Sequence, residues 1–111
     1  YSNLGTTLAK TGKLEEAIIQ FKEAIRVNPG LAMPHTNIGI ALAQNGKSDE
    51  AIVHFRKAIG INPDYALAHF SLGNVLFQKG ETQEAVTHFR EAVRLNPRFD
   101  LFRKTLEAAL L

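Results

Sequence analysis

An asparagine followed by a proline occurs three times in this chain at a fixed spacing of 34 residues, as Asn28-Pro29, Asn62-Pro63 and Asn96-Pro97. We use the word column for the set of residues at one position in successive units. Six further columns keep the same spacing, and they are Gly5, Gly39 and Gly73; Leu8, Leu42 and Leu76; Gly12, Gly46 and Gly80; Ala17, Ala51 and Ala85; Phe21, Phe55 and Phe89; and Ala24, Ala58 and Ala92. Such a period is typical of a repeat architecture, in which each unit packs on its neighbours.

The period divides the chain into three units, residues 1–31, 32–65 and 66–99, followed by a tail, residues 100–111. In each unit, apolar residues recur at helical spacing on both sides of the glycine in the Gly46 column. We name the helix before that glycine helix A and the helix after it helix B. Glycine suits the left-handed residue that ends a helix, and the proline at the end of the unit stops helix B. The sequence therefore predicts an all-α fold, one solenoid domain of antiparallel helix pairs.

A second glycine column lies inside helix A, at Gly5, Gly39 and Gly73. Glycine in a helix interior costs about 1 kcal/mol relative to alanine, so its recurrence indicates a steric need. We expect helix B to approach too closely there for a side chain to fit. Alanines of the Ala51 column are the predicted facing residues, and phenylalanines of the Phe55 column are the predicted large side chains beside them.

These columns resemble the tetratricopeptide repeat, in which Gly-x2-Leu is followed by Gly, Ala, Phe, Ala and Pro over 34 residues. The resemblance spans about 99 of the 111 residues. It departs at the column where the family often has Trp, because this chain has Tyr1, His35 and His69 there. The resemblance implies antiparallel helix pairs stacked into a right-handed superhelix, with the A helices lining a concave face that binds peptides or proteins.

The two ends of the repeat array differ from its middle. Unit 1 lacks the first three residues of the other units, so we interpret the sequence as a piece of a longer protein. The tail is in phase with helix A and is predicted to be a capping helix, with Phe102, Leu106, Ala109 and Leu110 as its apolar face. At the interior-glycine column it carries Glu107, as expected for a helix on which no helix B packs.

No motif in the chain predicts catalysis, a cofactor or a metal site. With zero Cys, disulfides, zinc–thiolate sites and cysteine nucleophiles are excluded. The histidines form two columns, His35 with His69 and His54 with His88. Side chains of one column on neighbouring units are expected to lie about 10 Å apart, too far to share a zinc ion. The glycines follow the repeat period and form no phosphate-binding loop.

The balance of charge and apolarity predicts neither nucleic-acid binding nor membrane insertion. Thirteen Lys and Arg against 11 Asp and Glu give a net charge of +2, with no clustered basic face. No apolar run approaches the roughly 18 residues that a membrane span needs. The absence of cysteine fits either redox state and leaves the compartment open, with the cytoplasm as the expected one.

Residues that point away from helix B on the A helices form the predicted peptide-binding surface. They are Asn3, Thr6, Met33, Thr36, Asn37, Ile40, Gln44, Leu67, Phe70, Asn74, Phe77 and Gln78. In unit 3 three apolar side chains and one amide share a stripe, which predicts anchoring of apolar peptide side chains and a bond to the peptide backbone. Under the alternative interpretation, Leu67 and Phe77 pack on the tail helix or on unit 2.

One column of this surface holds Asn3, Asn37 and Ser71. It resembles the asparagine ladder in the repeat arm of O-linked N-acetylglucosamine transferases, as does the sequence Ser2-Asn3-Leu4. Amides spaced along a groove bond a peptide backbone without reading its sequence. Another branch of the tetratricopeptide repeat family holds a terminal carboxylate with concave Lys and Arg. That clamp is not predicted here, since Lys10 is the one cation in the corresponding columns.

The sequence therefore predicts a non-catalytic module that binds a protein or peptide segment in its concave groove. Two alternatives stay open. In one, the segment is the substrate-recruiting arm of a larger enzyme, such as a glycosyltransferase. In the other, it is a self-assembly scaffold, a homo-oligomer joined through the repeat ends, where apolar surface is expected to be exposed.

Overall fold

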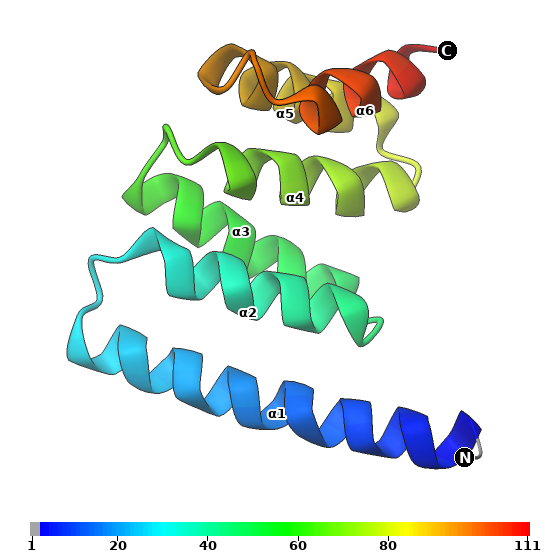
Figure 1. The fold of residues 1–111 in the computed structure, drawn as a ribbon. Coiled ribbons are helices and arrows are strands. Elements are labelled where there is room, and N and C mark those ends of the chain that lie inside the picture. Colours follow the sequence, from blue (N-terminus) through cyan, green and yellow to red (C-terminus); the bar gives the residue numbers. More distant parts are fainter. Residues whose placement is uncertain (1–2) are drawn as a thin grey trace.

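A computed structural model describes residues 3–111, and the side chains of Lys13 and of residues 15–111. Residues 3–111 form six helices and no strand (Figure 1). The helices are α1 (Asn3–Val27), α2 (Ala32–Gln44), α3 (Ser48–Ile61), α4 (Ala66–Gln78), α5 (Thr82–Leu95) and α6 (Asp100–Leu110). The predicted all-α solenoid is confirmed, with α2 and α4 as A helices and α3 and α5 as B helices. None of the helices in this described part is both long and apolar enough to cross a membrane.

The turns between the A and B helices of units 2 and 3 are formed by glycines in the left-handed region. Gly46 has a φ of 78° and Gly80 a φ of 86°. After Gly46, the amide of Lys47 donates to the carbonyl of Leu42 over 2.8 Å, and after Gly80 the same bond recurs over 2.9 Å. This bond pattern closes a helix and satisfies its last carbonyl groups. Both glycines therefore act as the sequence predicts.

The loops between units explain why asparagine precedes proline. The side-chain oxygen of Asn62 accepts a hydrogen bond of 3.1 Å from the amide of Asp64, and its carbonyl accepts one of 3.1 Å from the amide of Tyr65. In the preceding loop, the side chain of Asn28 accepts a bond of 3.2 Å from the amide of Gly30. An asparagine that bonds the backbone two residues ahead shapes a turn, and proline fixes the next φ.

Unit 1 departs from the predicted helix pair, because α1 continues without a turn through Gly12. The prediction of a first hairpin within residues 1–31 is therefore wrong for this structure. A glycine inside a helix costs only about 1 kcal/mol, so a turn forms there only where packing favours it. In units 2 and 3 helix A contacts a B helix on each side, as α4 contacts α3 and α5.

The interior glycines of helix A meet a phenylalanine ring of helix B. A Cβ added at Gly39 would lie 2.5 Å from the Phe55 ring, and one at Gly73 would lie 2.6 Å from the Phe89 ring. Neither distance leaves room for a methyl group, so the predicted steric need is confirmed. The facing group is mainly the phenylalanine and not, as predicted, the alanine, although the Ala85 carbonyl is 3.2 Å from the Gly73 position.

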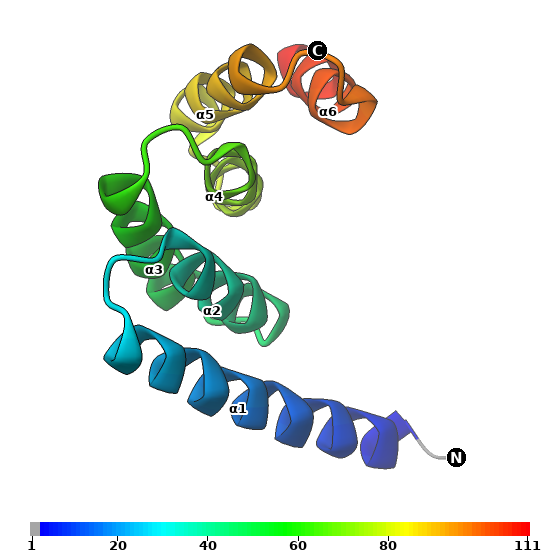
Figure 2. The ribbon, with the colours of Figure 1, turned by 60° about the vertical axis from the view of Figure 1, so that its left-hand side comes forward.

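The helices stack in chain order around one elongated core. Each helix contacts the next, and α2 also contacts α4. The main buried cluster of the described residues runs from α2 to α5, and its members are Ile38, Leu42, Ala51, Phe55, Leu72, Val75, Leu76, Ala85 and Phe89. A smaller cluster consists of Ala32, Ala58 and Ala68. Figure 2 shows the helices following an arc, with α2 and α4 on its inner side and α3 and α5 on its outer side. This arrangement places the A helices where a concave face is expected.

The tail forms α6, which packs on α5 as the predicted cap. Phe102 is buried, and Leu106 and Ala109 pack against the core as partly buried side chains. Leu110 is 54% exposed, so its predicted place on the buried face is wrong. Glu107 is exposed, as expected for a helix that has no further helix over it.

Candidate functional site

A groove of about 350 Å³ lies between α2 and α4. Its lining residues are Ile40, Ala43, Gln44, Phe55, Leu67, Phe70, Ser71, Asn74, Val75 and Gln78. Apart from Phe55, which comes from α3, all of them lie on the two A helices. The groove therefore crosses the boundary between units 2 and 3, and neither unit forms it alone.

The lining combines an apolar surface with three amide side chains. Leu67 is 37% exposed and Ile40 is half-buried, so both offer apolar atoms to a ligand. Phe55 and Val75 are buried and line the groove from the core side. The amides come from Gln44, Asn74 and Gln78. Each carboxamide carries two N–H donors and one carbonyl acceptor, which match the donors and acceptors of an extended peptide backbone.

No lining residue of this groove is charged. A carboxylate placed here would lose its hydration without gaining a cation, and burying an unpaired charge is costly. The lining therefore favours a neutral ligand with at least one apolar side chain.

Six of the predicted surface residues line the groove: Ile40, Gln44, Leu67, Phe70, Asn74 and Gln78. Phe70 also has a packing role, because its ring centroid lies 4.7 Å from that of Phe102 and 5.9 Å from that of Phe89. Phe70 thus joins α4 to the cap α6 while one part of it reaches the groove. The residue that packs on the tail helix is therefore Phe70, where the alternative interpretation named Leu67 and Phe77.

Four predicted residues lie away from the lining. Thr36 is completely buried and its hydroxyl bonds the carbonyl of Ala32 over 3.3 Å, so its predicted place on the surface is wrong. Met33 is 56% exposed but lines a separate hollow beside the loop of Asn62. Phe77 is 44% exposed and Asn37 is half-buried, and neither reaches the groove.

Two further predicted residues, Asn3 and Thr6, lie outside the described side chains, as do Ser2 and Lys10. Of the ladder column, Ser71 lines the groove and Asn37 does not. In the described part of that column, the residues therefore do not form a continuous ladder along this groove.

Three lining residues were not predicted, namely Ala43, Phe55 and Val75, and Ser71 was predicted only as a member of the ladder column. Phe55 and Val75 follow the apolar pattern of core residues, and this pattern does not show that part of each side chain also lines a groove. Ala43 stands in a column that points away from helix B, so helical position alone could have found it.

The four histidines form pairs that the sequence analysis did not predict. Each pair joins helix A to helix B of one unit: Nδ1 of His35 lies 3.2 Å from Nδ1 of His54, and Nδ1 of His69 lies 3.1 Å from Nδ1 of His88. The rings are stacked, with centroids 5.5 and 5.3 Å apart. His54 and His88 are half-buried. A column relates side chains of different units, whereas this contact lies within one unit.

Burial lowers the pKa of His35, His54 and His88, because the charged form loses hydration. The partner ring adds to this effect at His54 and His88. Two stacked rings whose Nδ1 atoms face each other share one proton between them, and a second proton has no acceptor there. The folded chain therefore favours the neutral forms of His35, His54 and His88.

Ion pairs on the outer helices link neighbouring units. Arg56 of α3 bonds Glu84 of α5 over 2.9 Å, and this bond lowers the pKa of the Glu84 carboxyl. Lys79 bonds Asp49 of α3. These pairs are largely exposed, so each is expected to contribute little to stability.

Comparisons with known proteins agree with this geometry. A family model described as TPR repeat matches residues 5–46 and 39–80, and one described as tetratricopeptide repeat matches residues 66–99. A search of the curated proteins found no match. Among solved structures, the first TPR of Spaghetti (RPAP3) bound to the HSP90 peptide SRMEEVD is similar to this chain, with a TM-score of 0.83 and 23% identity. The similarity covers 95% of this chain and 83% of that one.

Proposed function

Because this chain belongs to the tetratricopeptide repeat family, we propose that it is a protein-interaction module without catalytic activity. Its ligand is an extended peptide segment that lies in the groove between α2 and α4. The observation that carries this proposal is the lining itself, in which apolar side chains and three amides converge and no charge is present. Grooves of this kind bind peptides through apolar anchors and backbone hydrogen bonds.

The lining also supports a specific ligand chemistry. The similar solved structure is bound to SRMEEVD, a peptide that contains two glutamates and one aspartate. The groove of this chain has no lining cation to pair with such carboxylates. We therefore expect a preference for segments with a Leu, Ile, Met or Phe side chain and no acidic neighbour.

Selection from a random peptide display library on the purified protein tests this proposal. The expected outcome is enrichment of neutral segments that share one large apolar residue. Leu67→Ala combined with Asn74→Ala should then weaken the selected peptide about tenfold or more, since a central anchor and a backbone bond are lost. Enrichment of acidic sequences, or equal affinity in the double variant, would contradict the proposal.

Met33→Ala is the matched control for Leu67→Ala, because the two residues occupy one column of units 2 and 3. Met33 is exposed and lies outside the groove. Its replacement should leave peptide affinity unchanged. A loss of affinity in Met33→Ala would place the ligand on a different surface.

Self-assembly is a second candidate function, supported by the exposed apolar side chains of Phe99, Leu101 and Leu110 at α6. A second copy of this chain could cover them by packing its own helices there. Light scattering that shows a monomer at high concentration would argue against it. Recruitment of a substrate to a catalytic domain of a longer protein also stays a prediction, and the open reading frame of the parent tests it.

A further inference from the structure

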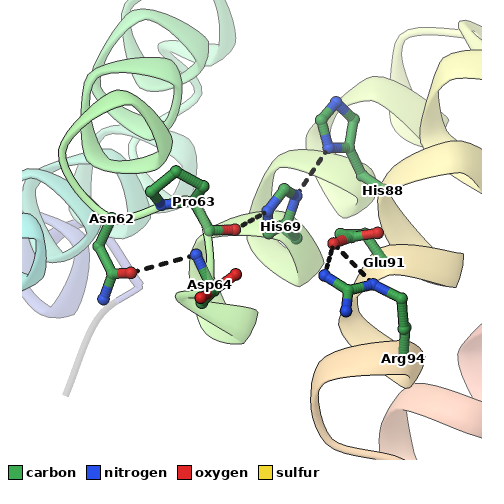
Figure 3. Close-up of polar contacts among 7 residues, drawn as sticks. All are labelled: Asn62, Pro63, Asp64, His69, His88, Glu91 and Arg94. Carbon is green, nitrogen blue, oxygen red and sulfur yellow. Dashed lines mark hydrogen bonds and ion pairs between the residues drawn. The ribbon is translucent and has the colours of Figure 1, made fainter.

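The pair of His69 and His88 has a geometry that none of the functions above requires. His69 lies on α4 and His88 on α5, and their Nδ1 atoms are 3.1 Å apart (Figure 3). We propose that these two nitrogens bind a divalent transition-metal ion, of the kind that prefers imidazole, between helix A and helix B of unit 3. Zinc, copper and nickel are ions of this kind.

The distance between the two nitrogens fits a shared ion. Imidazole nitrogens bind zinc at about 2.0–2.1 Å, so a separation of 3.1 Å corresponds to a nitrogen–metal–nitrogen angle of about 100°. This value lies between the angles of octahedral and tetrahedral coordination. The ring centroids lie 5.3 Å apart, so the two Nδ1 lone pairs point mainly at each other, and both rings must tilt toward the ion to bind it.

The outer nitrogen of each ring faces an oxygen atom of the kind that supports a metal-binding histidine. Nε2 of His69 donates to the carbonyl of Pro63 over 2.8 Å, which leaves the lone pair of Nδ1 for the ion (Figure 3). Nε2 of His88 lies 3.7 Å from Oε2 of Glu84. The carbonyl fixes the orientation of the His69 ring. Oε2 of Glu84 bonds Arg56 over 2.9 Å and must move closer before it can accept a hydrogen bond from His88.

Binding requires one rearrangement of protons. Without metal, Nδ1 of His88 donates to Nδ1 of His69, because the proton of His69 is on Nε2. When the ion binds, the Nδ1 proton of His88 leaves to solvent and Nε2 takes up a proton on the side of Glu84. No net proton is released when both rings are neutral. The ion replaces one shared proton and joins the same two helices.

The pair in unit 2 provides an internal contrast. Nδ1 of His35 and Nδ1 of His54 are 3.2 Å apart, so the central distance is nearly the same. Among the residues that the structure describes, however, no backbone carbonyl bonds the ring of His35. We therefore expect the ion to prefer unit 3.

Water completes the coordination of the ion. Within residues 13 and 15–111, no group of three or more His, Asp, Glu or Cys side chains is placed to hold a metal. A site with two protein ligands is weaker than a closed structural zinc site, which has four. The ion stabilises unit 3 in proportion to its concentration, because it binds the folded chain and clamps α4 to α5.

Titration of the untagged protein with Zn²⁺ tests this proposal, followed by NMR of the histidine ring protons at neutral pH. We expect the signals of His69 and His88 to shift first, with saturation below about 1 mM. His88→Gln should weaken Zn²⁺ binding more than tenfold, and the matched control His54→Gln should leave it unchanged. Equal binding in the two variants, or no shift at 1 mM, would overturn the proposal.

Glu84→Gln provides a test that does not disturb either ring. A carboxylate that supports a metal ligand contributes about 10–100-fold to affinity, so this variant should lose Zn²⁺ binding by about tenfold. A histidine pair with a purely structural role would show no such dependence. Unchanged Zn²⁺ affinity in Glu84→Gln would contradict the role of the carboxylate, and with it the proposed site.

Discussion

Units 2 and 3 have the same internal architecture but offer different surfaces to a ligand. In both units a glycine of helix A contacts a phenylalanine of helix B, at Gly39 with Phe55 and at Gly73 with Phe89. Both turns use a glycine with positive φ, and both helix pairs hold a stacked histidine pair. The repeated columns therefore determine how one helix packs on the next.

The columns that differ determine the groove. Unit 2 has Thr36 where unit 3 has Phe70, and the threonine is buried whereas the phenylalanine bridges the groove and α6. Unit 2 has Ile40 where unit 3 has Asn74, and both line the groove. One unit supplies an apolar group and the other an amide. In this chain, repeated positions form the scaffold, and the varied positions between them form the candidate site.

The substitution with the largest expected effect tests whether the helix pairs of units 2 and 3 pack in the same way. Phe55 and Phe89 are almost completely buried against equivalent glycines, so replacing either with alanine should destabilise the chain by about 3–5 kcal/mol. Urea unfolding followed by circular dichroism measures both values. If Phe55→Ala and Phe89→Ala differed by more than about half of that loss, the two units would not share one packing mode.

A smaller effect separates steric contact from helix propensity. Gly39→Ala places a methyl group against the Phe55 ring and should destabilise the fold by about 1–3 kcal/mol. Gly60→Ala is the matched control, because nothing lies within 4 Å of its Cβ position in α3. This control should stabilise the chain by about 0.5–1 kcal/mol. If both variants had the same sign in urea unfolding, the proposed contact would be disproved.

A pH titration compares the two histidine pairs. The pKa values of His35, His54 and His88 are lowered in the folded chain, so the unfolded chain binds more protons below about pH 6.5. Stability is therefore complete above that pH and falls as the pH decreases from there. Thermal unfolding between about pH 7.5 and pH 5.5 measures this loss. A midpoint that stayed constant over this range would contradict the buried neutral pairs.

Neighbouring charges determine how much each histidine contributes to the loss of stability at low pH. The pKa of His54 is lowered by Lys57 and Lys22 and raised by Glu50, whereas that of His88 is raised by Glu84 and lowered by Arg56. His54→Gln and His88→Gln should each remove part of the pH dependence. Equal slopes in the wild type and in both variants would mean that other groups cause the effect.

The smallest expected effect concerns the ion pair between units. Arg56 bonds Glu84 on the outer face, where both side chains are largely exposed. Arg56→Gln should therefore change the stability by less than about 1 kcal/mol, and the difference should shrink in high salt. Urea unfolding at low and high ionic strength measures it. A loss of unfolding free energy as large as that of Gly39→Ala would show that this ion pair stabilises the fold more than an exposed pair is expected to.

The repeat period was sufficient to predict the helix pairs, the turn glycines and the cap, because each depends on local sequence and on a contact that recurs. It was not sufficient for α1, because whether the chain turns at Gly12 depends on packing partners and not on the glycine alone. The histidine pairs were also missed. A column aligns His35 with His69, but the contact of His35 with His54 runs across one hairpin.

The residues of the groove were predicted only in part, because helical position alone does not determine whether a side chain is exposed. Helical position placed Ile40, Leu67 and Asn74 on the inner side, and they line the groove. The same reasoning placed Thr36 there, although its column lies close enough to the neighbouring helices for a small side chain to be buried. Side-chain size decides such positions, because the larger Phe70 in the same column reaches the groove.

Chemical-shift mapping tests the central claim, that the groove between α2 and α4 is the ligand site, most directly. The ¹⁵N-labelled protein would be titrated with the peptide obtained by display selection. The account predicts that the backbone and side-chain amide signals of Gln44, Asn74 and Gln78 shift together, while Val53 on the outer face of α3 stays unchanged. Shifts concentrated on α3 and α5, with the three groove amides unaffected, would contradict it.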